Sequence, residues 1–147
     1  MLKGNVKLTG RLAIAINGET VQEVKNLVVD AGKEHVTARL KDNTSDGVMS
    51  HMAVGTSSTA AAAGQTALVT ELSGSRTAFD SGFPDTQGTN SIKFETTFGE
   101  GIGTGALTEA GLFNASSAGT MLARTVFSTV NKGASDTMTI TWTITAS

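Results

Sequence analysis

The amino-acid sequence has 147 residues and a mass of 15.0 kDa, which is the usual size of one domain. It has no cysteine, which excludes disulfides and thiolate metal sites, and only two histidines. Eleven basic and 13 acidic residues give a net charge of −2, and nucleic acid is not expected as a partner because phosphate binding requires a basic surface. No apolar run is long enough for a membrane span or a signal peptide, so neither is expected.

The composition favours β-structure. Threonine is the commonest residue, and its β-branched side chain suits strands. The 17 glycines and the many serines suit the turns between them. We therefore expect an all-β fold, as one domain over residues 1–147, with a flexible N-terminal arm over residues 1–9.

A β-hairpin is predicted near the N-terminus. Apolar side chains alternate with small or polar ones over residues 11–16, which is the period of a strand with one buried face. Asn17 and Gly18 follow, and both tolerate the positive φ that a type I′ turn needs. Residues 20–24 then return as the partner strand.

One short helix is predicted over residues 30–41. Asp30 is a good N-cap, because its carboxylate can accept a backbone N–H bond. Val36 and Leu40 are four residues apart and share one helical face, which we expect to be buried. The polar stretch over residues 41–47 ends the helix.

The rest of the chain alternates between short strands and connections. Strands are predicted over residues 48–54, 92–98, 106–113 (with a bulge at Gly111), 120–127 and 137–145. Connections are predicted over residues 55–65 (loop or short helix), 66–72 (one helical turn), 73–90 and 99–105. Seven to nine strands with one helix favour a two-sheet β-sandwich or jelly roll.

The sequence has no recognisable catalytic or cofactor motif. The glycines of residues 99–105 lack the spacing and the following helix of a dinucleotide-binding loop. Ser50 and His51 are neighbours in a predicted strand and should point to opposite faces. A hydrolase built on a Glu71–Glu109 carboxylate pair is conceivable but less favoured than a structural role. We therefore expect no enzyme activity, no cofactor and no metal.

Glu109 and Arg124 stand out as charges within apolar strands. The two predicted strands that carry them are consecutive, so antiparallel pairing would bring the side chains together. A buried carboxylate needs such a partner. We predict a structural ion pair between Glu109 and Arg124.

Several ordered segments carry a resemblance to a known family; they are residues 26–34, 52–56, 68–71 with Arg76 after them, 105–115, 119–127 and 132–144. Over residues 26–144 the chain resembles small structural proteins of tailed bacteriophages and prophages, some described as tail-fibre-like. The resemblance implies a β-rich virion protein without enzyme activity. It implies a protein made in the cytoplasm of the bacterial host and placed on the outer surface of the phage particle.

Within that family, a compact chain without a repetitive shaft suits a capsid decoration (cement) protein better than a fibre. The expected partner is the major capsid protein, in a symmetric array or homo-oligomer, without nucleic acid or membrane. A tail, collar or fibre subunit bound to tail or neck proteins is the alternative. The candidate contact residues are Leu2, Lys3 and Val6 in the arm, Thr56 and Ser57 in the loop over 55–65, and Gly101, Ile102 and Gly103 in the loop over 99–105.

A carbohydrate- or receptor-binding module is a third alternative, because β-sandwiches also host lectins. Sugar sites favour stacking aromatic rings, and this interpretation requires Trp142 or Phe113 to be exposed. The alternation of residues 137–145 instead predicts that Trp142 faces the core.

Overall fold

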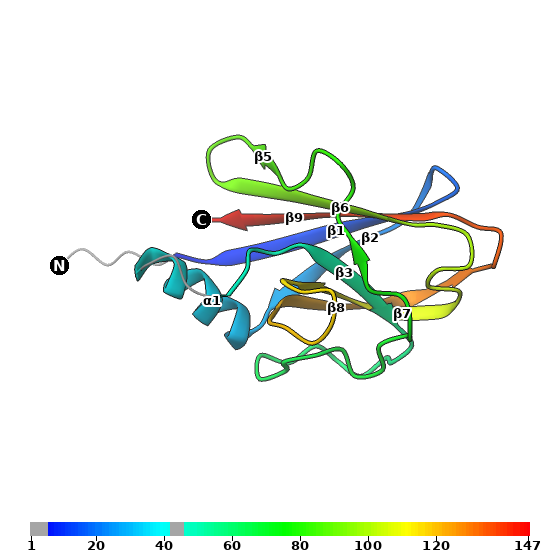
Figure 1. Cartoon of the computed structure of the whole chain (residues 1–147), viewed down its shortest axis with the longest axis horizontal. Helices are drawn as coiled ribbons and strands as arrows, with labels where there is room; N and C mark the ends of the chain where they lie inside the picture. Colours follow the sequence, from blue (N-terminus) through cyan, green and yellow to red (C-terminus); the bar gives the residue numbers. More distant parts are fainter. Residues whose placement is uncertain (1–5, 42–45) are drawn as a thin grey trace.

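The computed structural model describes residues 6–41 and 46–147 and is mainly β, as predicted. This described part has nine strands and one helix (Figure 1). They are β1 (Leu8–Ile16), β2 (Glu19–Val28), α1 (Asp30–Lys41), β3 (His51–Gly55), β4 (Thr77–Ala78), β5 (Asp85–Gln87), β6 (Ser91–Phe98), β7 (Gly105–Phe113), β8 (Met121–Lys132) and β9 (Met138–Ala146).

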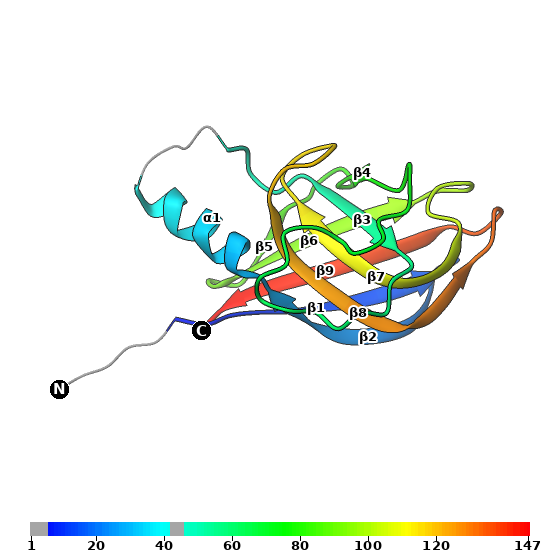
Figure 2. The same cartoon turned by 90° about the horizontal axis from the view of Figure 1, so that it is seen from below.

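The nine strands form one antiparallel sheet in the order β4-β3-β7-β8-β2-β1-β9-β6-β5. The sheet curls into a half-barrel, so that its two halves face one another (Figure 2). β2 joins the halves: it pairs with β1 from Glu19 to Asn26, and then with β8 through Leu27 and Val28. The predicted division into two separate sheets is therefore not confirmed, because a strand shared by both halves keeps the ladder continuous.

The predicted hairpin and helix are confirmed. Asn17 and Gly18 form the β1–β2 turn with φ values of 49° and 86°. The helix spans Asp30–Lys41, but its Val36–Leu40 face is only partly buried, because Leu40 is 84% exposed while Val36 packs against the core. Gly32 is instead the buried residue of the helix, and a Cβ there would be 2.2 Å from the carbonyl oxygen of Leu122.

Two smaller predictions are corrected. The irregularities of β7 lie between Leu107 and Glu109 and between Leu112 and Phe113, whereas Gly111 sits in regular pairing with Arg124. Gly111 is needed for packing, because a Cβ would come within 2.7–2.8 Å of the Phe113 ring and of Leu68. No helical turn forms over residues 66–72: the amides of Val69 and Thr70 bond to Glu109 on the outer face, and the amide of Leu72 bonds to the edge of β3.

The core fills the space between the two halves of the curled sheet. Residues from β1, β6 and β9 on one side meet residues from β3, β7 and β8 on the other, and Trp142, Ile140 and Leu112 are fully buried. A smaller apolar cluster lies on the outer face, around Phe113, Met121 and Leu68. The inward-facing alternation of β9 is therefore as its sequence predicts.

The two outermost strands are short, and their neighbours' free edges are covered. β4 has two residues and β5 has three. Where β3 extends past the end of β4, the backbone of Val54 bonds to the hydroxyl of Ser75 and to the amide of Leu72. Where β6 extends past the end of β5, the side chain of Asp80 accepts a hydrogen bond from the amide of Thr97. Such coverage protects a sheet from pairing with another chain.

Two turns meet at one end of the half-barrel. Asn17 donates from Nδ2 to Asp136 Oδ1 over 3.0 Å, and the amide of Gly133 donates to Asp136 Oδ2 over 2.8 Å. The amide of Thr137 donates back to Asn17 Oδ1 over 3.0 Å. The bond from the Asn17 side chain and, after it, the bond from the Gly133 amide lower the pKa of Asp136 below its ordinary value of 3.8.

Asp136→Asn is expected to lower stability at neutral pH and to weaken the loss of stability in acid. A carboxyl with a lowered folded-state pKa stabilises the fold above its unfolded value of 3.8, and this contribution is lost as the pH falls through the folded value. Urea unfolding between pH 2.5 and pH 7 measures it. Asn17→Ala removes the main donor and should flatten the profile in the same way; an unchanged acid profile in both variants would contradict the assignment.

Candidate functional site

Glu109 and Arg124 form the ion pair that their sequence positions predict. Arg124 lies opposite Gly111 in the β7–β8 ladder, so Glu109 is its diagonal neighbour. Arg124 Nη2 is 2.8 Å and Nε 2.9 Å from Glu109 Oε2, and both side chains are completely buried. The pair lies on the outer face of the sheet, away from the main core.

The ion pair fastens residues 56–76, which we call the strap, onto that outer face. Glu109 accepts hydrogen bonds from the amides of Thr70 (2.7 Å), Val69 (3.1 Å) and Ser57 (3.4 Å). Arg124 Nη1 donates to the carbonyl of Thr59 (2.9 Å) and to Gln65 Oε1 (3.1 Å). Every one of these bonds holds a segment far away in the sequence, so the geometry of the pair is that of a structural clamp.

Arg76 is a second clamp at the end of the strap. Its guanidinium lies 3.7 Å from the centre of the Phe113 ring, at cation–π distance. It pairs with Glu71 over 2.7 Å and donates to the carbonyls of Ala115 and Ala118. The alternative Glu71–Glu109 carboxylate pair is therefore not an open site, because each carboxylate is bound to its own arginine.

Ser50 and His51 are in contact, contrary to the expectation that they point apart. Ser50 Oγ lies 2.7 Å from His51 Nδ1. Strand alternation does not separate them, because β3 begins only at His51. The pKa of His51 is lowered, first by burial and then by the positive charge of Arg76. In a Ser-His-Asp triad a carboxylate stabilises the charged histidine, whereas His51 has the positive charge of Arg76 beside it.

The loop over 99–105, predicted to be flexible, is bonded to the β8–β9 turn. Gly101 donates its amide to the carbonyl of Ala134 over 2.9 Å, and the buried Lys132 donates from Nζ to the carbonyl of Gly99 over 2.8 Å. Burial lowers the pKa of Lys132. Ile102 is 39% exposed and available for contact, but Gly103 is buried and is not.

The other candidate contact residues differ in exposure. Thr56 is exposed although its amide bonds to the carbonyl of Thr70, and Ser57 is half-buried. Leu2 and Lys3 lie outside the described residues. Val6 is 83% exposed. The prediction of a flexible arm over residues 1–9 is wrong for residues 7–9, because Lys7 exchanges two backbone bonds with Ser147 and β1 begins at Leu8.

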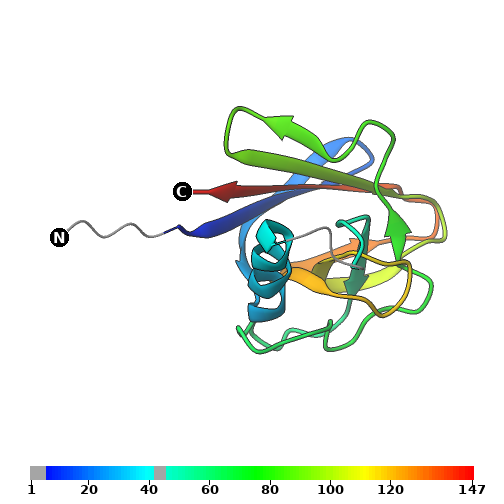
Figure 3. The ribbon, with the colours of Figure 1, turned by 60° about the vertical axis from the view of Figure 1, so that its left-hand side comes forward.

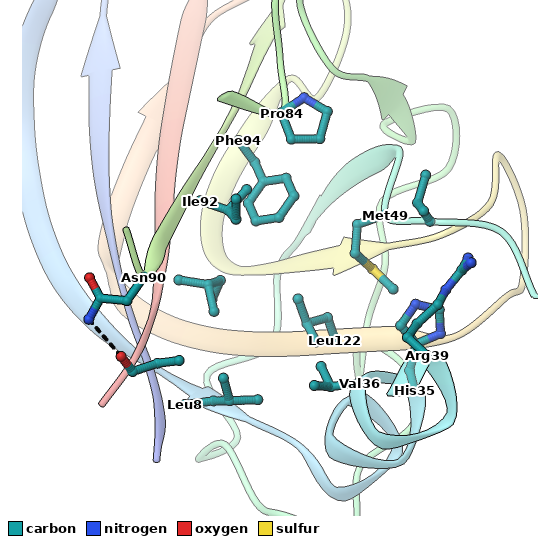
Figure 4. A pocket seen from close by; sticks show the side chains of 13 residues that line it. Leu8, His35, Val36, Arg39, Met49, Pro84, Asn90, Ile92, Phe94 and Leu122 are labelled. Atoms are coloured by element: carbon teal, nitrogen blue, oxygen red, sulfur yellow. Dashed lines mark hydrogen bonds between the residues drawn. The ribbon is translucent and has the colours of Figure 1, made fainter. Parts of the chain in front are cut away.

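Sequence reasoning missed an apolar groove between α1 and the open end of the half-barrel, which we call the α1 groove (Figure 4). Its inner part, about 420 Å³, is lined by side chains from α1, β6, β8 and β9, among them Val36, Phe94, Leu122 and Ile144. Its outer part, about 600 Å³, adjoins it through Leu8, Val36 and Ala146. The only sequence signal was the Val36–Leu40 pair, which predicted a buried helical face rather than a cavity.

Neither aromatic side chain that a sugar site would use is accessible. Trp142 is 0% and Phe113 is 1% exposed. Trp142 belongs to the main core, and Phe113 is covered by Arg76. The carbohydrate-binding alternative therefore lacks the exposed ring that it requires.

The fluorescence of Trp142, the single tryptophan, is expected to be blue-shifted and weakly quenched by acrylamide and iodide. A fully buried indole is shielded from solvent and from both quenchers. Stern–Volmer titration of the native protein, compared with the same protein in urea, measures this. Equal quenching in both conditions would contradict the burial of Trp142.

No protein-family model, no curated protein and no solved structure matches this chain. Within residues 6–41 and 46–147, no three histidine or acidic side chains are grouped as a metal site would require. In the same residues, no helix has the length and apolar character needed to cross a membrane.

Proposed function

We propose that this protein is a non-enzymatic structural protein of a tailed-phage virion, and specifically a decoration protein that binds the shell of the major capsid protein. The resemblance of residues 26–144 to phage structural proteins supports the virion role. The observation that carries the decoration role is a broad outer face on β1, β9 and β6. α1 packs on the opposite half of the sheet, against β8, and leaves this face open (Figure 3).

Short polar side chains make up the centre of this outer face, and Arg11 of β1 and Lys93 and Glu95 of β6 flank them. Its central row is Thr139, Thr141, Thr143 and Thr145 of β9, each half-buried. Thr141 bonds to Glu95 over 3.0 Å and Thr145 to Ser91 over 2.7 Å, so the hydroxyls are held in place by the neighbouring strand. Side chains that are already ordered lose little entropy on binding, and such a face suits wide, partly hydrated contacts.

Rigidity also supports a role based on contact area. Hydrogen bonds tie the strap and the loop over 99–105 to the rest of the fold and cover the edges of the sheet. In this proposal the facing halves of the curled sheet act together as a sandwich-like block. Such a block binds through its faces rather than by adding a strand, and many modest contacts on a symmetric shell give high avidity.

The decisive experiment is the copy number of this protein in purified virions, measured by quantitative mass spectrometry against the major capsid protein. Hundreds of copies per particle, and heads that rupture at a lower temperature without the protein, are the expected results. A few copies per particle would overturn the decoration role and place the protein in the tail, collar or fibre. Absence from the virion would overturn the proposal altogether.

A pair of variants tests the face itself. Thr141→Arg with Thr143→Arg places two long charged side chains in the central row and should abolish incorporation into heads. Ser128→Arg, at an exposed position on β8, is the matched control and should be incorporated normally. Normal incorporation of the double variant would show that another surface binds the shell.

A further inference from the structure

The α1 groove has the form of a small-molecule site. Ten of the 13 residues that line its inner part are apolar, and its volume of about 420 Å³ lies in the range of ligand pockets. Leu8, Val36, Leu122 and Phe94 point into it from four different elements (Figure 4). The mouth of a curled or closed sheet is a common place for such sites.

The groove continues outward along α1 toward solvent. Leu8, Val36 and Ala146 line both parts, so an extended molecule could run from one into the other. The outer part is flanked by Leu40 and Val6, which are 84% and 83% exposed. Exposed apolar side chains that gather around an apolar hollow indicate a binding surface rather than scattered surface residues.

The charges that line the groove are all of one sign. Lys7 and Lys33 line the outer part, and Arg39 lines the inner part beside the imidazole of His35, whereas none of the residues lining either part is acidic. This is unusual for a chain with a net charge of −2. An apolar cavity with a basic rim is complementary to a molecule with an apolar body and an anionic end.

The basic side chains at the two ends of the groove differ in what surrounds them. Arg39 donates to the backbone carbonyl of Asp46, and the pKa of His35 is lowered, first by burial and then by Arg39. Among residues 6–41 and 46–147, none of the ion pairs includes Lys7 or Lys33. The outer end of the groove is therefore the place where an anionic group gains most.

We propose that the α1 groove binds a single-chain anionic amphiphile, such as a fatty-acid carboxylate. The acyl chain runs under α1 and ends against Leu122, Phe94 and Met49. The carboxylate lies at the outer end, between Lys7 and Lys33. This inference goes beyond the virion role and does not depend on it, since it concerns the opposite side of the sheet.

Calorimetric titration of the full chain with dodecanoate, below its micelle concentration, tests the proposal. One molecule should bind per chain. Each methylene removed from the acid should weaken binding roughly fourfold, because burying a methylene contributes about 0.8 kcal/mol. Dodecyltrimethylammonium has the same tail with the opposite charge and should bind at least tenfold more weakly. No saturable binding, several molecules per chain, or equal binding of both amphiphiles would overturn the proposal.

Charge-reversal variants locate the headgroup. Lys33→Glu should weaken dodecanoate binding about tenfold or more and strengthen binding of the cationic amphiphile. Lys25→Glu, at an exposed lysine on β2 outside the groove, is the matched control and should leave both affinities unchanged. Equal effects of the two variants would show that only the net charge of the protein affects binding, and they would overturn the assignment of the carboxylate to the α1 groove.

The groove must also be open in the free protein. Sedimentation velocity of the wild type and of Leu40→Glu, a change at an exposed position, should give the same monomer mass. A dimer that Leu40→Glu dissociates would mean that a second copy of the chain occupies the groove, and it would overturn the proposal.

Discussion

Arg124→Ala is expected to lower the free energy of unfolding by about 3–5 kcal/mol, the usual cost of removing one partner from a buried ion pair. Glu109 would remain fully buried without its counter-ion, and the carbonyl of Thr59 would lose its donor. Urea unfolding at neutral pH, read by circular dichroism, measures the loss. Unchanged stability would refute the structural role of the pair.

A double variant separates the charge effect from simple loss of contacts. Glu109→Gln with Arg124→Met removes both charges, and the amide oxygen of glutamine can still accept the bond from Thr70. This variant should recover a large part of the stability that Arg124→Ala loses, because no buried charge is left unpaired. A double variant as unstable as Arg124→Ala would show that packing, rather than charge, dominates.

The same variants report on the strap. The amides of Val69 and Thr70 donate to Glu109, so they should exchange hydrogen slowly in the wild type and much faster in Arg124→Ala. Exchange in β9, on the other side of the molecule, should increase less. A uniform increase would mean that the strap is not a separate unit held by the ion pair.

Gly32→Ala is expected to destabilise the protein by about 2–3 kcal/mol, in the range typical of overpacking. In most helix interiors this change is stabilising, because alanine is the better helix former by about 1 kcal/mol. Here the added Cβ would lie 2.2 Å from the backbone carbonyl oxygen of Leu122, which cannot rotate away as a side chain could. α1 would have to move off β8.

Gly64→Ala is the matched control for this prediction. Gly64 has open space around its Cβ position and no positive φ, so alanine there should be neutral or stabilise by about 0.4–1 kcal/mol. Thermal and urea unfolding of both variants give the comparison. A Gly32→Ala variant more stable than wild type would contradict the close contact between α1 and β8.

Local chemistry explains which elements the sequence alone predicts. The hairpin of β1 and β2 depends on alternation and on the Asn17-Gly18 turn, and α1 begins at Asp30, where the sequence predicts its start, so residues close in the sequence indicate each. The burial of Trp142 follows from the alternation of β9. The Glu109–Arg124 contact was predictable because a charge in an apolar strand needs a partner on an adjacent strand.

The tertiary structure alone decided how these elements combine. The alternation of β2 fits a sandwich as well as a curled sheet, and its pairing with β8 joins residues about a hundred positions apart, which no local pattern specifies. The bonds from the strap to Glu109 come from backbone amides, which any side chain could accompany, so no local pattern in residues 56–76 predicts that they meet Glu109. The α1 groove exists because Gly32 fixes the helix near β8 while Leu40 extends past the sheet, and that distance depends on the packing of the whole fold.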